Sequence, residues 1–290
     1  MRTDKRRLPY ARLRFGKTAG RLALAAGIIL LAVFTLAAIA PSVFTDYSPT
    51  QAFSAWQSPS AEHILGTNDM GYDVFTELVY ATRQTLLVGV TSAAVALLLG
   101  TLLGLAASGK GIIGAAANGI INLFMMVPKL PLIIMLAAFL RGGETETILI
   151  IAAFGWVTTA RSVRAKALHL AGMPFVESLT AAGYSPARIT FRHILPNVGE
   201  VAVTRYVSTV ASSIMTEATL SFLGLGDITS PTWGTMINFA YKRGAFVLGS
   251  YGWLLAPGFA IMLLVLAFWC LWYYAESRSR EVQGAKSIMD

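Results

Sequence analysis

Long apolar runs recur along this chain of 290 residues, and they restrict its possible folds more than any other feature. A helix needs about 20 consecutive apolar residues to cross a lipid bilayer. The first such run, residues 22–40, contains no charged side chain. Charged residues make up only 13% of the whole chain, against roughly 25% in a soluble domain. We therefore expect an all-α protein that crosses a membrane several times.

We predict six transmembrane helices, separated where charged residues, glycine and proline interrupt the apolar pattern. These spans cover residues 22–40, 85–108, 112–140, 147–160, 201–225 and 253–274. A short helix from about Tyr72 should lead into the second span. Pro128 and Pro131 should break or kink the third, because proline removes a helix hydrogen bond and clashes with the preceding turn. The expected division is a tail of residues 1–21, a transmembrane domain of 22–275 and a tail of 276–290.

The placement of basic residues predicts the orientation of these spans. Eight of them precede the first span, namely Arg2, Lys5, Arg6, Arg7, Arg12, Arg14, Lys17 and Arg21. Residues 41–82 contain no Lys or Arg at all. Because basic residues accumulate on cytoplasmic loops, both tails should be cytoplasmic. The net charge of +8 then reflects these flanks rather than nucleic-acid binding.

The first run could also be a cleaved signal peptide, but it is longer than the usual apolar core of 7–15 residues, so we expect an uncleaved helix.

Residues 173–197 combine polar and apolar side chains between two strongly apolar segments. Pro174 suits the first turn of a helix, and Gly183 suits the left-handed residue that ends one. Ser185 and Pro186 form a typical helix start, with a capping hydroxyl followed by proline. We therefore predict two short helices joined at Gly183, with the second ending at Pro196. The preceding basic cluster around Arg161 places this hairpin on the cytoplasmic side.

Several segments together resemble the inner-membrane permeases of binding-protein-dependent ABC importers, in the branch that carries dipeptides, oligopeptides or nickel. Glu177 and Gly183 stand as in the EAA loop of that family, although the box itself reads Glu177-Ser178-Leu179. The other matching segments are residues 63–73 (H-I-L-G-T-N-D-M-G-Y-D), 192–197 (R-H-I-L-P-N), 216–226 (T-E-A-T-L-S-F-L-G-L-G), 231–234 (P-T-W-G) and 257–258 (P-G). The sequence departs from the family pattern at Tyr72, where Arg is usual, and at Lys129, which is usually apolar.

This resemblance implies the type I ABC importer permease fold, with a cytoplasmic coupling loop at about residues 166–200. The partners that it implies are a homologous second permease, two ABC ATPase subunits, an extracytoplasmic solute-binding protein and membrane lipid in a bacterial inner membrane. Nucleic acid is not among them. The residues expected to couple the chain to its ATPases are Glu177, Ala181, Gly183, Arg188, Arg192, His193, Leu195 and Pro196. An apolar face of Phe175, Leu179, Ile189 and Ile194 would anchor the hairpin in an ATPase groove.

The resemblance favours a di- or oligopeptide as cargo, with nickel or a metal–chelator complex as the alternative. An intramembrane enzyme is a different possibility, but no G-x-S-x-G, H-E-x-x-H or paired aspartates supply catalytic residues. A non-transporting assembly factor is a third. No G-x-x-x-x-G-K-S/T motif occurs, so ATP and Mg²⁺ should bind to the partner ATPases and no cofactor to this chain. No metal site is expected either, because His63 should lie outside the membrane and His169 and His193 inside.

Three charged residues fall within predicted spans, where charge is costly and often functional. Lys129, Arg205 and Glu217 could line the translocation path or its gate, and a zwitterionic peptide would find complementary charges there. Alternatively, Arg205 extends to the cytoplasmic interface, Glu217 binds nearby backbone N–H groups, and Lys129 binds carbonyls freed by the prolines.

The predicted outer segment contains a second candidate site. Gly66, Thr67, Asp69, Gly71 and Asp73 could shape the outer vestibule or contact the binding protein. A turn that only supports the fold is the alternative.

Overall fold

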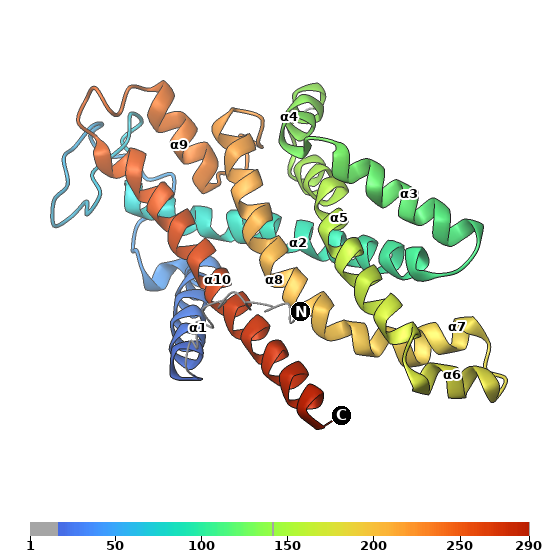
Figure 1. Ribbon diagram of the computed structural model, residues 1–290. Helices are drawn as coiled ribbons and strands as arrows, with labels where there is room; N and C mark the ends of the chain where they lie inside the picture. The colour runs from blue at the N-terminus through green and yellow to red at the C-terminus, as the bar shows by residue number, and fades with distance from the viewer. Residues whose placement is uncertain (1–16, 141, 290) are drawn as a thin grey trace, which may run out of the picture.

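The computed structural model describes residues 17–140 and 142–289, and this part of the chain is built from helices (Figure 1). Residues 1–16, with six of the eight basic residues of the predicted N-terminal tail, lie outside the described residues. The helices are α1 Lys17–Ile39, η1 Pro41–Val43, α2 Val74–Ser108, α3 Ile112–Met126, α4 Lys129–Phe139, α5 Glu144–Ala171, α6 Pro174–Ala181, α7 Pro186–Ile189, η2 Thr190–Ile194, α8 Leu195–Phe222, α9 Trp233–Lys242 and α10 Tyr251–Met289.

Four helices in the described ranges are long and apolar enough to cross a membrane: α1, α2, α5 and α10. The helices α3 and α4 meet at 88° and could together form a fifth crossing. This break lies at the predicted position, next to Pro128. The fifth predicted span, residues 201–225, falls mostly in α8, which has 28 residues but is not among these helices. Polar residues along it, Arg205 and Glu217 among them, lower its hydropathy, and its crossing stays a prediction.

The helix predicted from about Tyr72 begins at Val74, and it is continuous with the second span in α2, a single helix of 35 residues. Asp73 caps its first turn, with Oδ1 accepting a hydrogen bond of 2.7 Å from the backbone N–H of Thr76. No proline interrupts the helix afterwards. At 1.5 Å per residue it is about 52 Å long, which exceeds the roughly 30 Å of a bilayer core. One end of α2 must therefore extend beyond the hydrocarbon.

Closely packed glycines join α2 to α5 near the centre of the molecule. A Cβ at Gly100 would lie 2.7 Å from the carbonyl oxygen of Trp156, and one at Gly104 would lie 2.6 Å from that of Ala160. Such contacts leave no space for a side chain. The two helices cross as backbones in close approach, which small residues allow in membrane bundles.

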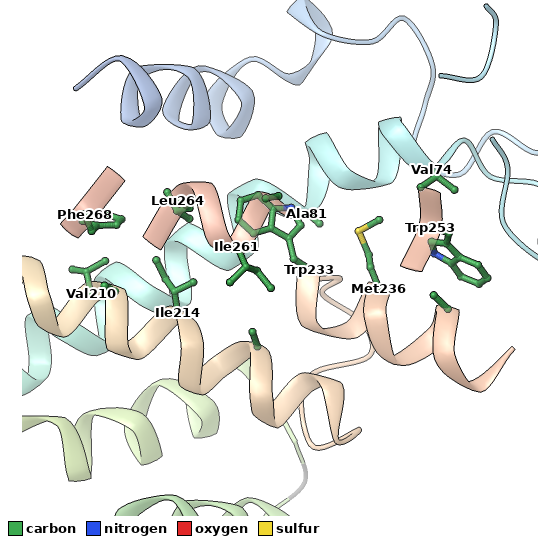
Figure 2. Packing of buried hydrophobic residues seen from close by; sticks show 14 of the residues in the cluster. Val74, Ala81, Val210, Ile214, Trp233, Met236, Trp253, Ile261, Leu264 and Phe268 are labelled. Atoms are coloured by element: carbon green, nitrogen blue, oxygen red, sulfur yellow. The ribbon is translucent and has the colours of Figure 1, made fainter. Parts of the chain in front are cut away.

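A second region of tight packing joins α2, α8, α9 and α10 (Figure 2). Trp233 is fully buried there, and Figure 2 shows its indole among Ala81, Ile261 and Met236. Its Nε1–H donates a hydrogen bond of 2.9 Å to the carbonyl of Leu78, so the buried polar atom is satisfied. This contact fixes the start of α9 against α2.

The helix α7 continues through the π-helical turn η2 directly into α8, so the prediction that Pro196 ends the second hairpin helix is wrong. Pro196 instead lies in the first turn of α8, where its missing N–H is tolerated. The wider turn before it is marked by the backbone N–H of Leu195, which bonds to the carbonyl of Thr190. Residues 186–222 therefore form one helical rod that leads from the hairpin into the core (Figure 1).

Candidate functional site

The helices α6 and α7 form the predicted hairpin, and its turn has the predicted geometry. Gly183 has a φ of +84°, the left-handed conformation that glycine adopts without strain. Its N–H donates to the carbonyl of Thr180 at 3.0 Å, and the N–H of Tyr184 donates to that of Leu179 at 3.1 Å. The oxygen of Ser185 accepts from the N–H of Arg188 at 3.4 Å at the start of α7. The hairpin is thus a defined pair of capped helices.

The apolar face of the hairpin packs within the chain itself. Ile189 and Ile194 are each only 5% exposed, and with Val176 they pack against Leu105 of α2 and Val163 of α5. The prediction that Ile189 and Ile194 anchor an ATPase groove is therefore wrong. They hold the hairpin onto the ends of α2 and α5. A sequence pattern shows that a helix face is apolar, but it cannot distinguish a face that packs within the chain from one that binds a partner.

The opposite side of the hairpin presents most of the predicted coupling residues. Those exposed are Glu177, Ala181, Gly183, Arg188, Arg192 and Pro196, while His193 and Leu195 are half-buried. Phe175, which is 37% exposed, adds an accessible aromatic ring. The Arg188 guanidinium lies 5.6 Å from the centre of the Tyr184 ring, a cation–π contact. The exposed side therefore combines charged, aromatic and small residues.

A cavity of about 400 Å³ lies between α3, α4, α5 and α8. Lys129 and Arg205, two of the three predicted path residues, both line it. The Lys129 Nζ donates a hydrogen bond of 3.4 Å to the Ser212 hydroxyl of α8, rather than to a carbonyl freed by proline. Further hydroxyls on α8, among them Ser208 and Thr209, make this wall polar. The structure thus places two cationic residues that are far apart in the sequence around one cavity.

Glu217 does not line this cavity, so the structure gives no support to its predicted place in the path. It is 1% exposed and lies at the contact of α8 with α9. Its Oε1 accepts hydrogen bonds from the hydroxyls of Ser221 at 2.6 Å and Thr232 at 2.7 Å. Thr232 is also the N-cap of α9. Glu217 therefore fastens α9 to α8 through hydroxyls, not through the backbone N–H groups that we expected.

Replacing Glu217 should separate its structural role from a role in transport. Glu217→Gln keeps a carbonyl oxygen that can accept both hydroxyl hydrogen bonds, so we expect near-normal stability and transport. Glu217→Leu leaves Ser221 and Thr232 without their acceptor and should cost about 1–3 kcal/mol per buried unsatisfied group. Thermal unfolding and uptake by the two purified variants check this. Loss of transport in a fully stable Glu217→Gln variant would contradict it.

The predicted outer candidate site is a folded cap in front of α2. Four of its five residues are buried: Gly66, Thr67, Gly71 and Asp73. The Oδ2 of Asp73 lies 2.9 Å from the Nδ1 of His63, and both side chains are almost fully buried. Asp69, by contrast, is partly accessible and pairs with Arg243 at 3.2 Å. These contacts agree with the scaffold alternative, and a binding-protein contact stays a prediction that Asp69 alone of the five is placed to make.

Asp73→Ala should destabilise the outer cap. The substitution removes the cap of α2, which is typically worth about 1 kcal/mol, and leaves His63 buried without its carboxylate. We expect the melting temperature of the purified protein to fall. Asp46→Ala, a change of the same type at an exposed position, should leave it unchanged. Equal melting temperatures for Asp73→Ala and the wild type would rule out a structural role for the pair.

Sequence reasoning missed the roles of two residues, Asn68 in the outer cap and Thr232 beside Glu217. Asn68 organises the cap: its Oδ1 accepts from the N–H groups of Met70 at 2.8 Å and Tyr72 at 2.9 Å, and its Nδ2 donates to Glu77 at 3.0 Å. The signal was present, because Asn followed by Asp-Met-Gly is typical of a side-chain-supported turn. The second is Thr232, whose capping box with Thr235 could be recognised only as a helix start, not as a partner of Glu217.

Comparison with known proteins identifies the class. The family described as the inner membrane component of binding-protein-dependent transport systems matches residues 96–281, and the chain belongs to this family. The resemblance noted in the sequence is thereby confirmed. The protein is a helical, multi-pass component of an inner-membrane transport system. Membership implies ATPase and binding-protein partners.

Individual relatives cover most of the chain. The dipeptide transport system permease protein DppC of Alkalihalophilus pseudofirmus is 35% identical over 246 residues, which cover 83% of this chain and 80% of the relative. The oligopeptide transport system permease protein OppC of Bacillus subtilis is 33% identical over 267 residues, covering 89% and 84%. A solved structure of the MetNI methionine ABC transporter in an inward-facing conformation is 21% identical, covers 67% of this chain and 97% of its own, and has a TM-score of 0.48.

Proposed function

We propose that this chain is a permease subunit of an ATP-driven importer that carries di- or oligopeptides across the inner membrane. The names of its relatives, DppC and OppC, support peptides as cargo. One structural observation carries the mechanism. The hairpin packs on the end of α5 and continues directly into α8, and α5 and α8 both line the central cavity. A force applied to the hairpin can therefore act directly on the cavity walls.

The complete importer would contain a homologous second permease, two ATPase subunits and an extracytoplasmic binding protein. In the proposed arrangement, six spans form the domain of residues 22–275, both tails are cytoplasmic, and residues 166–200 form the coupling loop. ATP and Mg²⁺ bind to the ATPases only. When ATP draws the ATPases together, the exposed side of α6 and α7 moves with them. The continuous helical rod of residues 186–222 moves as a rigid element and transmits this movement of the hairpin to the cavity wall.

Transport by the purified complex tests this function. The permease pair, the ATPases and the binding protein are reconstituted in liposomes, and uptake of labelled di- and oligopeptides is measured with and without ATP. We expect ATP-dependent peptide uptake. The binding protein is screened in parallel for thermal stabilisation by peptides, nickel and metal chelates, since a ligand stabilises the protein that it binds. The peptide assignment would be overturned if the importer took up nickel or a chelate but no peptide, or if nickel or a chelate stabilised the binding protein and peptides did not. A complex that purifies without ATPases would overturn transport itself.

A further inference from the structure

A second cavity, of about 510 Å³, lies between α3 and α5 and adjoins the central cavity. Met125 lines both cavities. Its Sδ atom lies 3.8 Å from the Nη1 of Arg161, which lines only the second one. The other residues around the second cavity are Asn118, Ile121, Asn122, Met126 and Arg164. The two cavities therefore meet at the side chain of Met125.

The direction from the first cavity to the second follows α5 toward the hairpin. Thr158 lines the central cavity and Arg161, three residues later, lines the second. Residues three apart lie on one helix face, separated by about 4.5 Å along the axis. The helix then ends at Ala171, immediately before α6. The two cavities thus form one tract from the core toward the side that we assign to the cytoplasm.

The charged groups along this tract have a single sign. Lys129 and Arg205 line the central cavity, and Arg161 and Arg164 line the second. In the described part of the chain, neither lining includes an Asp or Glu. Glu217, which would have supplied a balancing charge, is held instead by Ser221 and Thr232. Because cations gathered along one cleft raise its positive potential, they favour an anionic ligand.

The neutral groups along the tract suit the same ligand. Side-chain amides of Asn118 and Asn122 and the hydroxyl of Ser212 can donate hydrogen bonds to an anion. The fork of an arginine binds a carboxylate through two parallel hydrogen bonds. The Nε of Arg164 is already used, since it donates to the carbonyl of Ala107 at 3.2 Å, which holds the side chain in position.

We propose that this chain supplies the anion-binding wall of the translocation path, along which carboxylate groups of the cargo pass from Lys129 and Arg205 to Arg161 and Arg164. This inference rests on the proposed function, because it takes the cargo to be a peptide. A peptide always has a terminal carboxylate, and acidic side chains add to it. The subunit should therefore favour acidic over basic peptides of equal length.

Uptake of peptides that differ only in side-chain charge tests the proposal. The complete importer is reconstituted with wild-type chain, Lys129→Gln or Arg161→Gln, and uptake is compared for Ala-Glu, Ala-Gln and Ala-Lys. We expect either substitution to lower Ala-Glu uptake by about tenfold relative to Ala-Lys uptake, the size of a lost charged hydrogen bond. The binding protein is the same throughout, so its own preference cancels from the ratio of variant to wild type.

Matched variants distinguish charge from damage to the fold. Lys110→Gln removes the same charge from an exposed residue that lines neither cavity, and should leave the ratio unchanged. Lys129→Arg keeps the charge and should restore Ala-Glu uptake. If Lys129→Gln and Arg161→Gln lower the uptake of all three peptides equally, or not at all, the anion-binding wall is refuted while peptide transport stands. If the wild-type importer takes up none of the three dipeptides and no longer peptide either, the proposed function itself fails.

Discussion

Gly183→Pro should abolish ATP-driven uptake by the reconstituted importer while the chain still inserts in the membrane. Proline fixes φ near −65°, whereas residue 183 has a φ of +84°. The substitution also removes the N–H that bonds to the carbonyl of Thr180. The turn between α6 and α7 must then open, and the exposed coupling residues lose their relative positions. Uptake and substrate-stimulated ATP hydrolysis by the same preparation measure the effect.

Gly183→Ala is the control for this prediction. A Cβ at position 183 would have no atom within 4 Å, so only the left-handed backbone opposes alanine, at a cost of about 1–2 kcal/mol. We expect reduced but measurable uptake. Uptake by Gly183→Pro at the wild-type rate would show that the turn geometry is not needed for coupling.

Gly104→Leu should prevent the chain from folding into a stable complex. A Cβ at Gly104 would lie 2.6 Å from the carbonyl oxygen of Ala160 and 2.8 Å from Val163, so leucine would push α5 away from α2. Overpacking of this kind typically costs about 1–3 kcal/mol and more where backbone must move. Size-exclusion chromatography and thermal unfolding of the solubilised complex should show aggregation or a large loss of stability.

The control for Gly104→Leu is Gly119→Leu, the same substitution in α3 at a position with no atom within 4 Å of a Cβ. It should leave the complex intact. Equal stability of the two variants would contradict the close approach of α2 and α5.

The parts of the fold that depend on local chemistry could be predicted from the sequence. The turn at Gly183 and the cap at Ser185 need only residues next to them, and the break beside Pro128 follows from proline itself. The predictions were wrong where the packing of distant segments determines the local structure. Pro196 is compatible both with a helix end and with a first turn, and only the π-helical turn before it selects the second.

The candidate sites show the same division. Lys129 and Arg205 stood out as charges in apolar segments, and both line the central cavity. Glu217 stood out for the same reason, yet it faces Ser221 and Thr232, because the direction of a side chain depends on the position of α9. Ile189 and Ile194 marked an apolar face correctly, but the sequence could not reveal that α2 and α5 already cover it.

The coupling role of the hairpin is the central claim, and site-specific cross-linking tests it most directly. Cys270 is the chain's single cysteine, so Cys270→Ser provides a background without thiols. In that background, Ala181→Cys places a thiol on the exposed side of the hairpin and Ser60→Cys places one on the exposed outer cap. A thiol-reactive cross-linker applied to the assembled importer should join Ala181→Cys, and not Ser60→Cys, to an ATPase subunit. An ATPase adduct at Ser60→Cys with none at Ala181→Cys would contradict both the coupling role and the proposed orientation.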